Sequence, residues 1–148
     1  MRRKTRKLGT LAVAALLSLA AASTARAADT RAPFDGAAYF NLRDTTGSDF
    51  VVKLTDPARI REAREIVDKG ERKYLIGRIV KQRADYNRRW DFHYNPDTVS
   101  FADQVIEVCD ATIPYVEDHL DEAGGPFLPG LYWCPWSGRL TRELPAAP

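Results

Sequence analysis

The sequence predicts an α+β fold: an antiparallel sheet of about five strands, one main helix packed across it and a second, shorter helix. Three observations support this class. Two β-like runs flank a segment dense in turn formers, a capped amphipathic helix pattern follows, and a later run alternates aromatic with polar residues. Short connections between successive strands favour antiparallel pairing, so the helices belong on one side of the sheet.

The N-terminus has the three parts of a secretory signal peptide. Residues 1–7 are strongly cationic, residues 8–22 are apolar, and Ala25-Arg26-Ala27 is a small-x-small cleavage site. A membrane anchor needs about 20 apolar residues, and this run is shorter and ends at a cleavage site. We therefore expect a secreted, extracellular protein with no membrane span once the signal peptide is removed.

The chain then divides into a signal peptide (1–27), a flexible lead-in (28–36), a single α+β domain (37–142) and a frayed tail (143–148). A mature chain of this length suits one domain with a modest core, and we expect a monomer.

Removal of the signal peptide reverses the sign of the net charge. The full chain has 22 Lys and Arg and 20 Asp and Glu, and residues 1–27 hold six of the basic residues and none of the acidic ones. The mature chain therefore has 16 basic and 20 acidic side chains, a net charge of −4. Nucleic-acid binding needs a cationic surface, so we do not expect a nucleic-acid partner.

The first half of the domain predicts a hairpin and a helix. Residues 38–43 and 50–54 are the two strands, and the turn-rich residues 44–49 join them. In residues 57–69 apolar side chains recur at helical spacing among charged ones, with Asp56 placed as N-cap and Gly70 as the terminating residue. The charges are typical of a solvated helix face.

The second half predicts strands at 74–81 and 90–94, separated by a polar loop at 82–89. Gly77 marks a bulge or a close approach within the first of these strands. Residues 98–109 look mostly extended, and 110–122 has the apolar spacing of a helix. An aromatic tail follows.

Several motifs, read together, resemble a family of small exported bacterial proteins. The shared domain of that family also forms the N-terminal domain of a slime-mould protein described as calmodulin-binding. The motifs are Phe50 to Pro57, Gly77 to Val80, Tyr86-Asn87-x-x-Trp90-x-Phe92-His93, Ile106 to Asp110, Tyr115 to Glu117 and Trp133 to Ser137. The resemblance implies no established reaction and no catalytic residues. The calmodulin label does not transfer, because a calmodulin target is a net basic helix with large apolar anchors and helix 57–69 is near neutral.

Two cysteines remain in the mature chain, Cys109 and Cys134. In an exported protein an even pair indicates a disulfide. Because Trp133-Cys134-Pro135-Trp136 is not a C-x-x-C motif, we expect a structural rather than a redox bond. Two cysteines without a histidine at ligand spacing make a poor metal site, so no metal and no cofactor are expected.

The histidines offer little chemistry. His93 is a candidate general base oriented by Asp91 or Asp110, although a strand histidine more often makes a structural hydrogen bond. His119 lies in an acidic segment (Glu117, Asp118, Asp121, Glu122) that could bind a divalent cation, but its spacing fits no Ca²⁺ loop and favours a solvated helix face.

Two hypotheses about function remain open. The first is a non-enzymatic binding module for an extracellular protein or carbohydrate, for example an inhibitor of an extracellular enzyme. Its candidate contacts are Tyr86 and Asn87, with Arg88 and Arg89, in one loop and Trp136 in the region 124–136; Trp133 to Pro135 belong in the core. The second is a small extracellular hydrolase using His93 with a nearby carboxylate. The absence of a nucleophile motif favours the first.

We predict that the secreted protein begins at or next to Ala28, because cleavage follows the Ala25-Arg26-Ala27 site. The intact mass of protein from the culture medium measures this. Retention of Met1 in a membrane fraction would contradict it.

Overall fold

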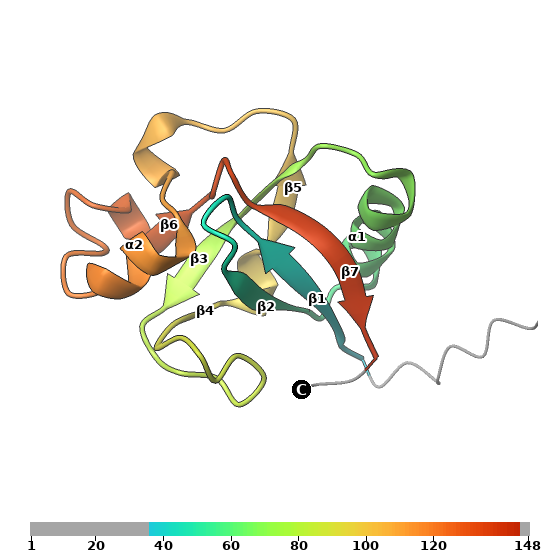
Figure 1. Cartoon of the computed structure of the whole chain (residues 1–148), viewed down its shortest axis with the longest axis horizontal. Helices are drawn as coiled ribbons and strands as arrows, with labels where there is room; N and C mark the ends of the chain where they lie inside the picture. Colours follow the sequence, from blue (N-terminus) through green and yellow to red (C-terminus); the bar gives the residue numbers. More distant parts are fainter. Residues whose placement is uncertain (1–35, 146–148) are drawn as a thin grey trace, which may run out of the picture. The chain divides into compact units, whose positions relative to one another are not determined.

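The computed structural model describes residues 36–145, so the predicted signal peptide and its cleavage site lie outside the described residues. In chain order the elements are β1 (Ala38–Arg43), β2 (Asp49–Leu54), α1 (Pro57–Lys69), β3 (Tyr74–Val80), β4 (His93–Tyr94), η1 (Pro96–Thr98), β5 (Ser100–Ala102), η2 (Glu107–Cys109), α2 (Ile113–Asp118), η3 (Pro129–Leu131), β6 (Tyr132–Trp133) and β7 (Arg139–Leu144). The predicted α+β class, with antiparallel pairing, one main helix and one short helix, is confirmed (Figure 1).

The strands form two sheets rather than the single sheet that the sequence predicted. The first has the order β2-β1-β7, and in the second β3 pairs with β4, β5 and β6 along successive parts of its length. The prediction of one five-stranded sheet was wrong because β2 does not pair with a further strand. Its outer edge is covered by side chains of the loop between β3 and β4, as described below.

The first sheet contains the predicted hairpin and one strand that the sequence did not predict. β1 and β2 pair in antiparallel register from Ala38↔Leu54 to Arg43↔Asp49. β7 pairs with the other edge of β1, with a bulge between Asn41 and Leu42. β7 includes residues 143 and 144, which the sequence analysis assigned to the tail. Its residues are mostly polar and partly exposed, so no apolar alternation revealed it.

Helix α1 begins and ends where the sequence predicted. The Asp56 carboxylate accepts hydrogen bonds from the backbone N–H groups of Ala58 (2.6 Å) and Arg59 (3.1 Å). Gly70 follows the helix with a φ of 64°, a left-handed conformation that glycine adopts without strain. Ile60, Ala63 and Ile66 form the buried stripe. Arg64 joins the helix to β7 through two hydrogen bonds to the Glu143 carboxylate, at 2.8 and 2.6 Å.

Four aromatic side chains join the two sheets in the core. Trp133 of β6 is fully buried, stacks on Tyr94 with ring centroids 4.9 Å apart, and meets Phe50 and Phe92 edge-on at 5.3 Å each. Phe50 comes from the first sheet, and the others come from the second sheet or the residue just before it. Gly77 allows this packing, since a Cβ there would lie 2.9 Å from the Tyr94 ring. The predicted close approach at Gly77 is therefore confirmed.

The segment from residue 90 to 122 contains less regular structure than predicted. Trp90, Phe92 and Tyr94 are all buried, as their alternation indicated, but only His93–Tyr94 pairs as a strand. Helix α2 is confined to Ile113–Asp118, within the predicted range of 110–122. Within residues 36–145, no helix is long and apolar enough to cross a membrane.

The predicted disulfide is confirmed. Cys109 at the end of η2 is bonded to Cys134 after β6, with Cα atoms 5.1 Å apart. The Cys134 N–H also donates to the Cys109 carbonyl oxygen at 2.8 Å. The bond therefore joins the irregular segment after β5 to the strand that carries Trp133.

We predict that Cys109→Ser with Cys134→Ser lowers the free energy of unfolding by about 3 kcal/mol, because the bond closes a loop whose restriction of the unfolded chain has roughly that value. Urea unfolding of both proteins measures the difference. The parent protein in reducing buffer is the matched control and should reproduce the loss; equal stability of the oxidised and reduced forms would contradict the prediction.

Candidate binding surface

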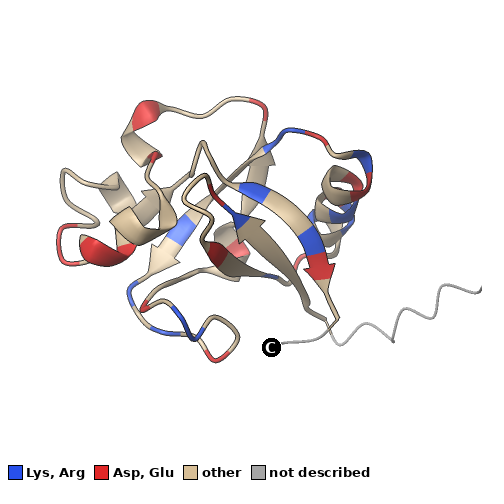
Figure 2. Ribbon diagram, viewed as in Figure 1, with Lys and Arg blue, Asp and Glu red and all other residues tan. Residues whose placement is uncertain are grey.

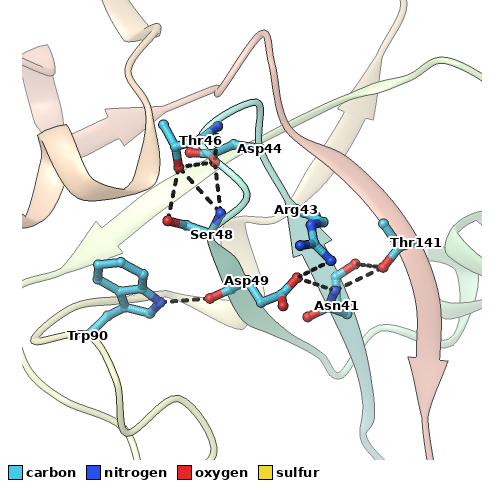
Figure 3. Close-up of polar contacts among 8 residues, drawn as sticks. All are labelled: Asn41, Arg43, Asp44, Thr46, Ser48, Asp49, Trp90 and Thr141. Carbon is cyan, nitrogen blue, oxygen red and sulfur yellow. Dashed lines mark hydrogen bonds and ion pairs between the residues drawn. The ribbon is translucent and has the colours of Figure 1, made fainter.

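The loop between β3 and β4 covers the free edge of β2. The Asn87 carboxamide accepts a hydrogen bond from the Val51 N–H (3.1 Å) and donates one to the Phe92 carbonyl oxygen (3.2 Å). The Trp90 indole N–H donates to the Asp49 carbonyl oxygen at 2.8 Å (Figure 3). These bonds satisfy backbone groups that an uncovered edge strand would leave available for another chain. They also fix the loop on the first sheet.

Asn87 is consequently not the exposed contact that the sequence analysis predicted. Only 3% of its surface is exposed, because both ends of its carboxamide are used inside the fold. The sequence placed Asn87 in a polar loop and could not show that the edge of β2, far away in the chain, needed this amide.

A second polar network ties the hairpin turn to α2. The Asp44 carboxylate is buried and accepts hydrogen bonds from the backbone N–H of Thr46 and of Ser48 (Figure 3). Its other oxygen accepts from the Ile113 N–H at 2.8 Å, at the start of α2. The sequence analysis recognised a turn here but not its long-range contact. This network is structural, and its carboxylate faces backbone donors rather than solvent.

Tyr86 lies half-buried on the outer face of the first sheet. Its ring is 5.5 Å from that of Tyr39 and meets His93 edge-on at 6.0 Å, and the Lys53 ammonium lies 5.9 Å from its centroid. Burial, together with the neighbouring Tyr39, raises the pKa of Tyr86 to about 12. The hydroxyl is therefore protonated at neutral pH and can donate a hydrogen bond. Tyr39, at an outward position of β1, was not among the predicted contacts.

An open pocket of about 300 Å³ lies beside Tyr86; we call it the Tyr86 pocket. Its lining combines residues of β2 with the end of the loop: Asp49, Val51, Asp85, Tyr86, Asn87, Arg88 and Arg89. Arg88 donates to the Asp85 carbonyl oxygen at 2.9 Å, and the Arg89 guanidinium lies 5.0 Å from the Trp90 ring centroid. Both arginines are exposed, so the pocket offers an aromatic edge, two cations and two carboxylates to a ligand.

His93 makes the structural hydrogen bond that the sequence analysis favoured. Its Nδ1 lies 2.7 Å from the Gln82 carbonyl oxygen, to which it donates. Asp91 pairs with Arg83, and the Asp110 carboxylate accepts from the Trp136 N–H at 2.8 Å. Neither proposed orienting carboxylate is directed at the imidazole.

The other predicted surface lies apart from the Tyr86 pocket. Trp133, Cys134 and Pro135 are buried, as predicted, whereas Trp136 keeps 37% of its surface exposed. Figure 1 shows the loop between β3 and β4 at the lower edge of the fold and η2 at its upper edge, with the disulfide tying η2 to the end of β6. The two regions do not form one site.

The acidic segment around His119 shows packing rather than coordination. The imidazole stacks on Tyr115 with centroids 4.0 Å apart, and its Nδ1 lies 2.9 Å from the Tyr115 carbonyl oxygen. In the part of the chain that the structure describes, no three His, Cys, Asp or Glu side chains are arranged to hold a metal ion.

These features define a class: a disulfide-linked α+β domain with two antiparallel sheets around an aromatic core and a loop fixed across one sheet edge. The chain belongs to the family defined by the N-terminal domain of a Dictyostelium calmodulin-binding protein, and the model of that family matches residues 36–147. This membership agrees with the resemblance found in the motifs. Neither the curated proteins nor the solved structures contain a match to the chain.

We predict that Asn87→Ala lowers the free energy of unfolding by about 1–3 kcal/mol, because it leaves the buried Val51 N–H and Phe92 carbonyl without partners. Arg88→Ala, at the exposed neighbouring position, is the matched control and should change stability by no more than about 0.5 kcal/mol. Denaturant unfolding of the three proteins measures both values. Equal stability of the Asn87 and Arg88 variants would show that the edge contact contributes nothing.

Proposed function

We propose that this domain is an exported, non-enzymatic binding module that engages an extracellular protein or carbohydrate at the Tyr86 pocket. The observation that carries the proposal is the fixed loop. Asn87 and Trp90 hold the loop on the edge of β2, and this places Tyr86 beside two exposed arginines. Because the loop is already ordered, binding a ligand would not carry the entropic cost of ordering it.

The chemistry of the pocket suits a ligand with both apolar and polar groups. Tyrosine and arginine are the residue types most often found at binding hot spots, since they combine a large contact area with hydrogen-bond donors. The protonated Tyr86 hydroxyl adds a donor, and the Asp85 side chain adds an acceptor. A pocket of about 300 Å³ is at the lower end of the range for small ligands, and it matches one sugar ring or one inserted side chain better than a large cofactor.

The alternative of a hydrolase centred on His93 gains no support from this geometry. The imidazole donates its Nδ1 proton to a backbone carbonyl and touches the edge of Tyr86. A general base needs an accessible proton acceptor and, in the usual arrangement, a carboxylate that orients the ring. Inhibition of an extracellular enzyme is the more specific form of the binding proposal, and the exposed loop would be the inserted element.

We predict that Tyr86→Ala with Arg88→Ala reduces capture of the native partner at least about tenfold, because both hot-spot side chains are removed from the pocket. The immobilised mature domain is exposed to the culture medium of the producing cells, and bound protein and carbohydrate are identified and then titrated. Arg72→Ala, an exposed change in the connection before β3, is the matched control.

Undiminished binding by the folded double variant would place the surface elsewhere. Consumption of the captured partner by the purified domain, abolished by His93→Ala without unfolding, would establish the enzymatic alternative instead.

A further inference from the structure

A second surface is formed by apolar side chains at the other end of the domain. Ile106 is 67% exposed, Val108 59% and Trp136 37%. Within the described residues, the large apolar side chains that are exposed all come from positions 106–136, and the other two are Tyr115 and Tyr132. Single exposed apolar residues are ordinary on a protein surface, but a group gathered in one region marks an interaction site.

The disulfide holds the two parts of this surface together. Ile106 and Val108 lie on the η2 side of Cys109, and Trp136 lies just after Cys134. The Asp110 carboxylate accepts the Trp136 N–H at 2.8 Å, which adds a second tie between the segments. The apolar groups are therefore presented on a rigid base, so little conformational entropy would be lost when a partner covers them.

The charge around these side chains has one sign. Residues 103–136 contain seven Asp and Glu and no Lys or Arg, whereas the rest of residues 28–148 contains 13 acidic and 16 basic side chains. In the described part of the chain, Asp103 is the only one of the seven in an ion pair, with Lys73. Figure 2 shows the acidic residues on η2 and around α2, and the basic ones on α1, β7 and the loop between β3 and β4.

We propose that the surface formed by Ile106, Val108 and Trp136, with the carboxylate of Glu107 among them, docks a cationic amphipathic segment of an extracellular protein. Its apolar side chains would cover the three exposed ones, and its Lys or Arg side chains would meet unpaired carboxylates. Anionic partners, including acidic lipid surfaces, are repelled by the same charges. This surface does not depend on the Tyr86 pocket, and either proposal can fail alone.

The experiment uses a short synthetic amphipathic peptide of Lys and Leu as the probe, titrated by calorimetry into the mature domain. Peptides in which Glu replaces Lys, or Ser replaces Leu, are the controls for charge and for apolar contact. We expect measurable affinity for the Lys and Leu peptide alone. Raising the salt concentration should weaken it, since exposed charges are screened within about 10 Å at 0.1 M salt.

Variants then locate the binding. Ile106→Ser with Val108→Ser should weaken the Lys and Leu peptide at least about tenfold, and Glu107→Gln should reduce the salt dependence. Tyr86→Ala is the matched control and should leave this affinity unchanged while it weakens the ligand of the Tyr86 pocket. Near-ultraviolet circular dichroism and a thiol assay confirm that each variant is folded with its disulfide intact.

Three results would overturn the proposal. They are equal binding of the Glu and Leu peptide, full affinity in the folded Ile106 and Val108 double variant, and loss of peptide binding in Tyr86→Ala. Binding of zwitterionic lipid vesicles that is abolished by the double variant, without binding of the Lys and Leu peptide, would assign the surface to a membrane instead.

Discussion

The burial of Trp133 is the interaction on which the rest of the fold depends. β6 is only two residues long, and it places this indole between Phe50 of the first sheet and Tyr94 of the second. The indole N–H donates to the Ala111 carbonyl oxygen at 2.9 Å, so the polar edge of the ring is satisfied just before α2 begins. Large aromatic side chains contribute most of the buried apolar area in a small core, and here one of them touches both sheets and the α2 segment.

This arrangement explains where the chain can be irregular. The disulfide follows Trp133 directly, and it holds the poorly structured segment around η2 against the core without a strand or a long helix. The loop between β3 and β4 is fixed in another way, by hydrogen bonds from Asn87 and Trp90 to the edge of β2. In both places irregular backbone is ordered by a few specific contacts. Such segments can present side chains at low entropic cost, which is why the proposed binding surfaces lie there.

The two surfaces differ in chemistry. The Tyr86 pocket combines an aromatic ring with arginines and two carboxylates, whereas the surface around Ile106 is apolar and surrounded by acidic residues alone. A charge distribution divided between two ends of a domain favours different partners at each end and orients their approach. Membership of the family named after the Dictyostelium calmodulin-binding protein is consistent with the fold and adds no catalytic residue to either surface.

The sequence by itself determined the local structure and the covalent link. Asp56, Pro57 and Gly70 specify the limits of α1 through backbone capping, the alternation in residues 38–54 specifies the hairpin, and two cysteines in an exported chain leave one disulfide. All of these depend on neighbouring residues or on a simple count. The tertiary structure alone decided that there are two sheets, that β7 joins β1, and that Asn87 is buried. Those outcomes depend on which backbone groups of β1 and β2 remain free after the hairpin forms, and on which distant residues reach them. Hydrogen-bonding partners separated by dozens of residues leave no periodic signal in the sequence, so a polar loop residue and an edge-capping amide look the same until the chain is folded.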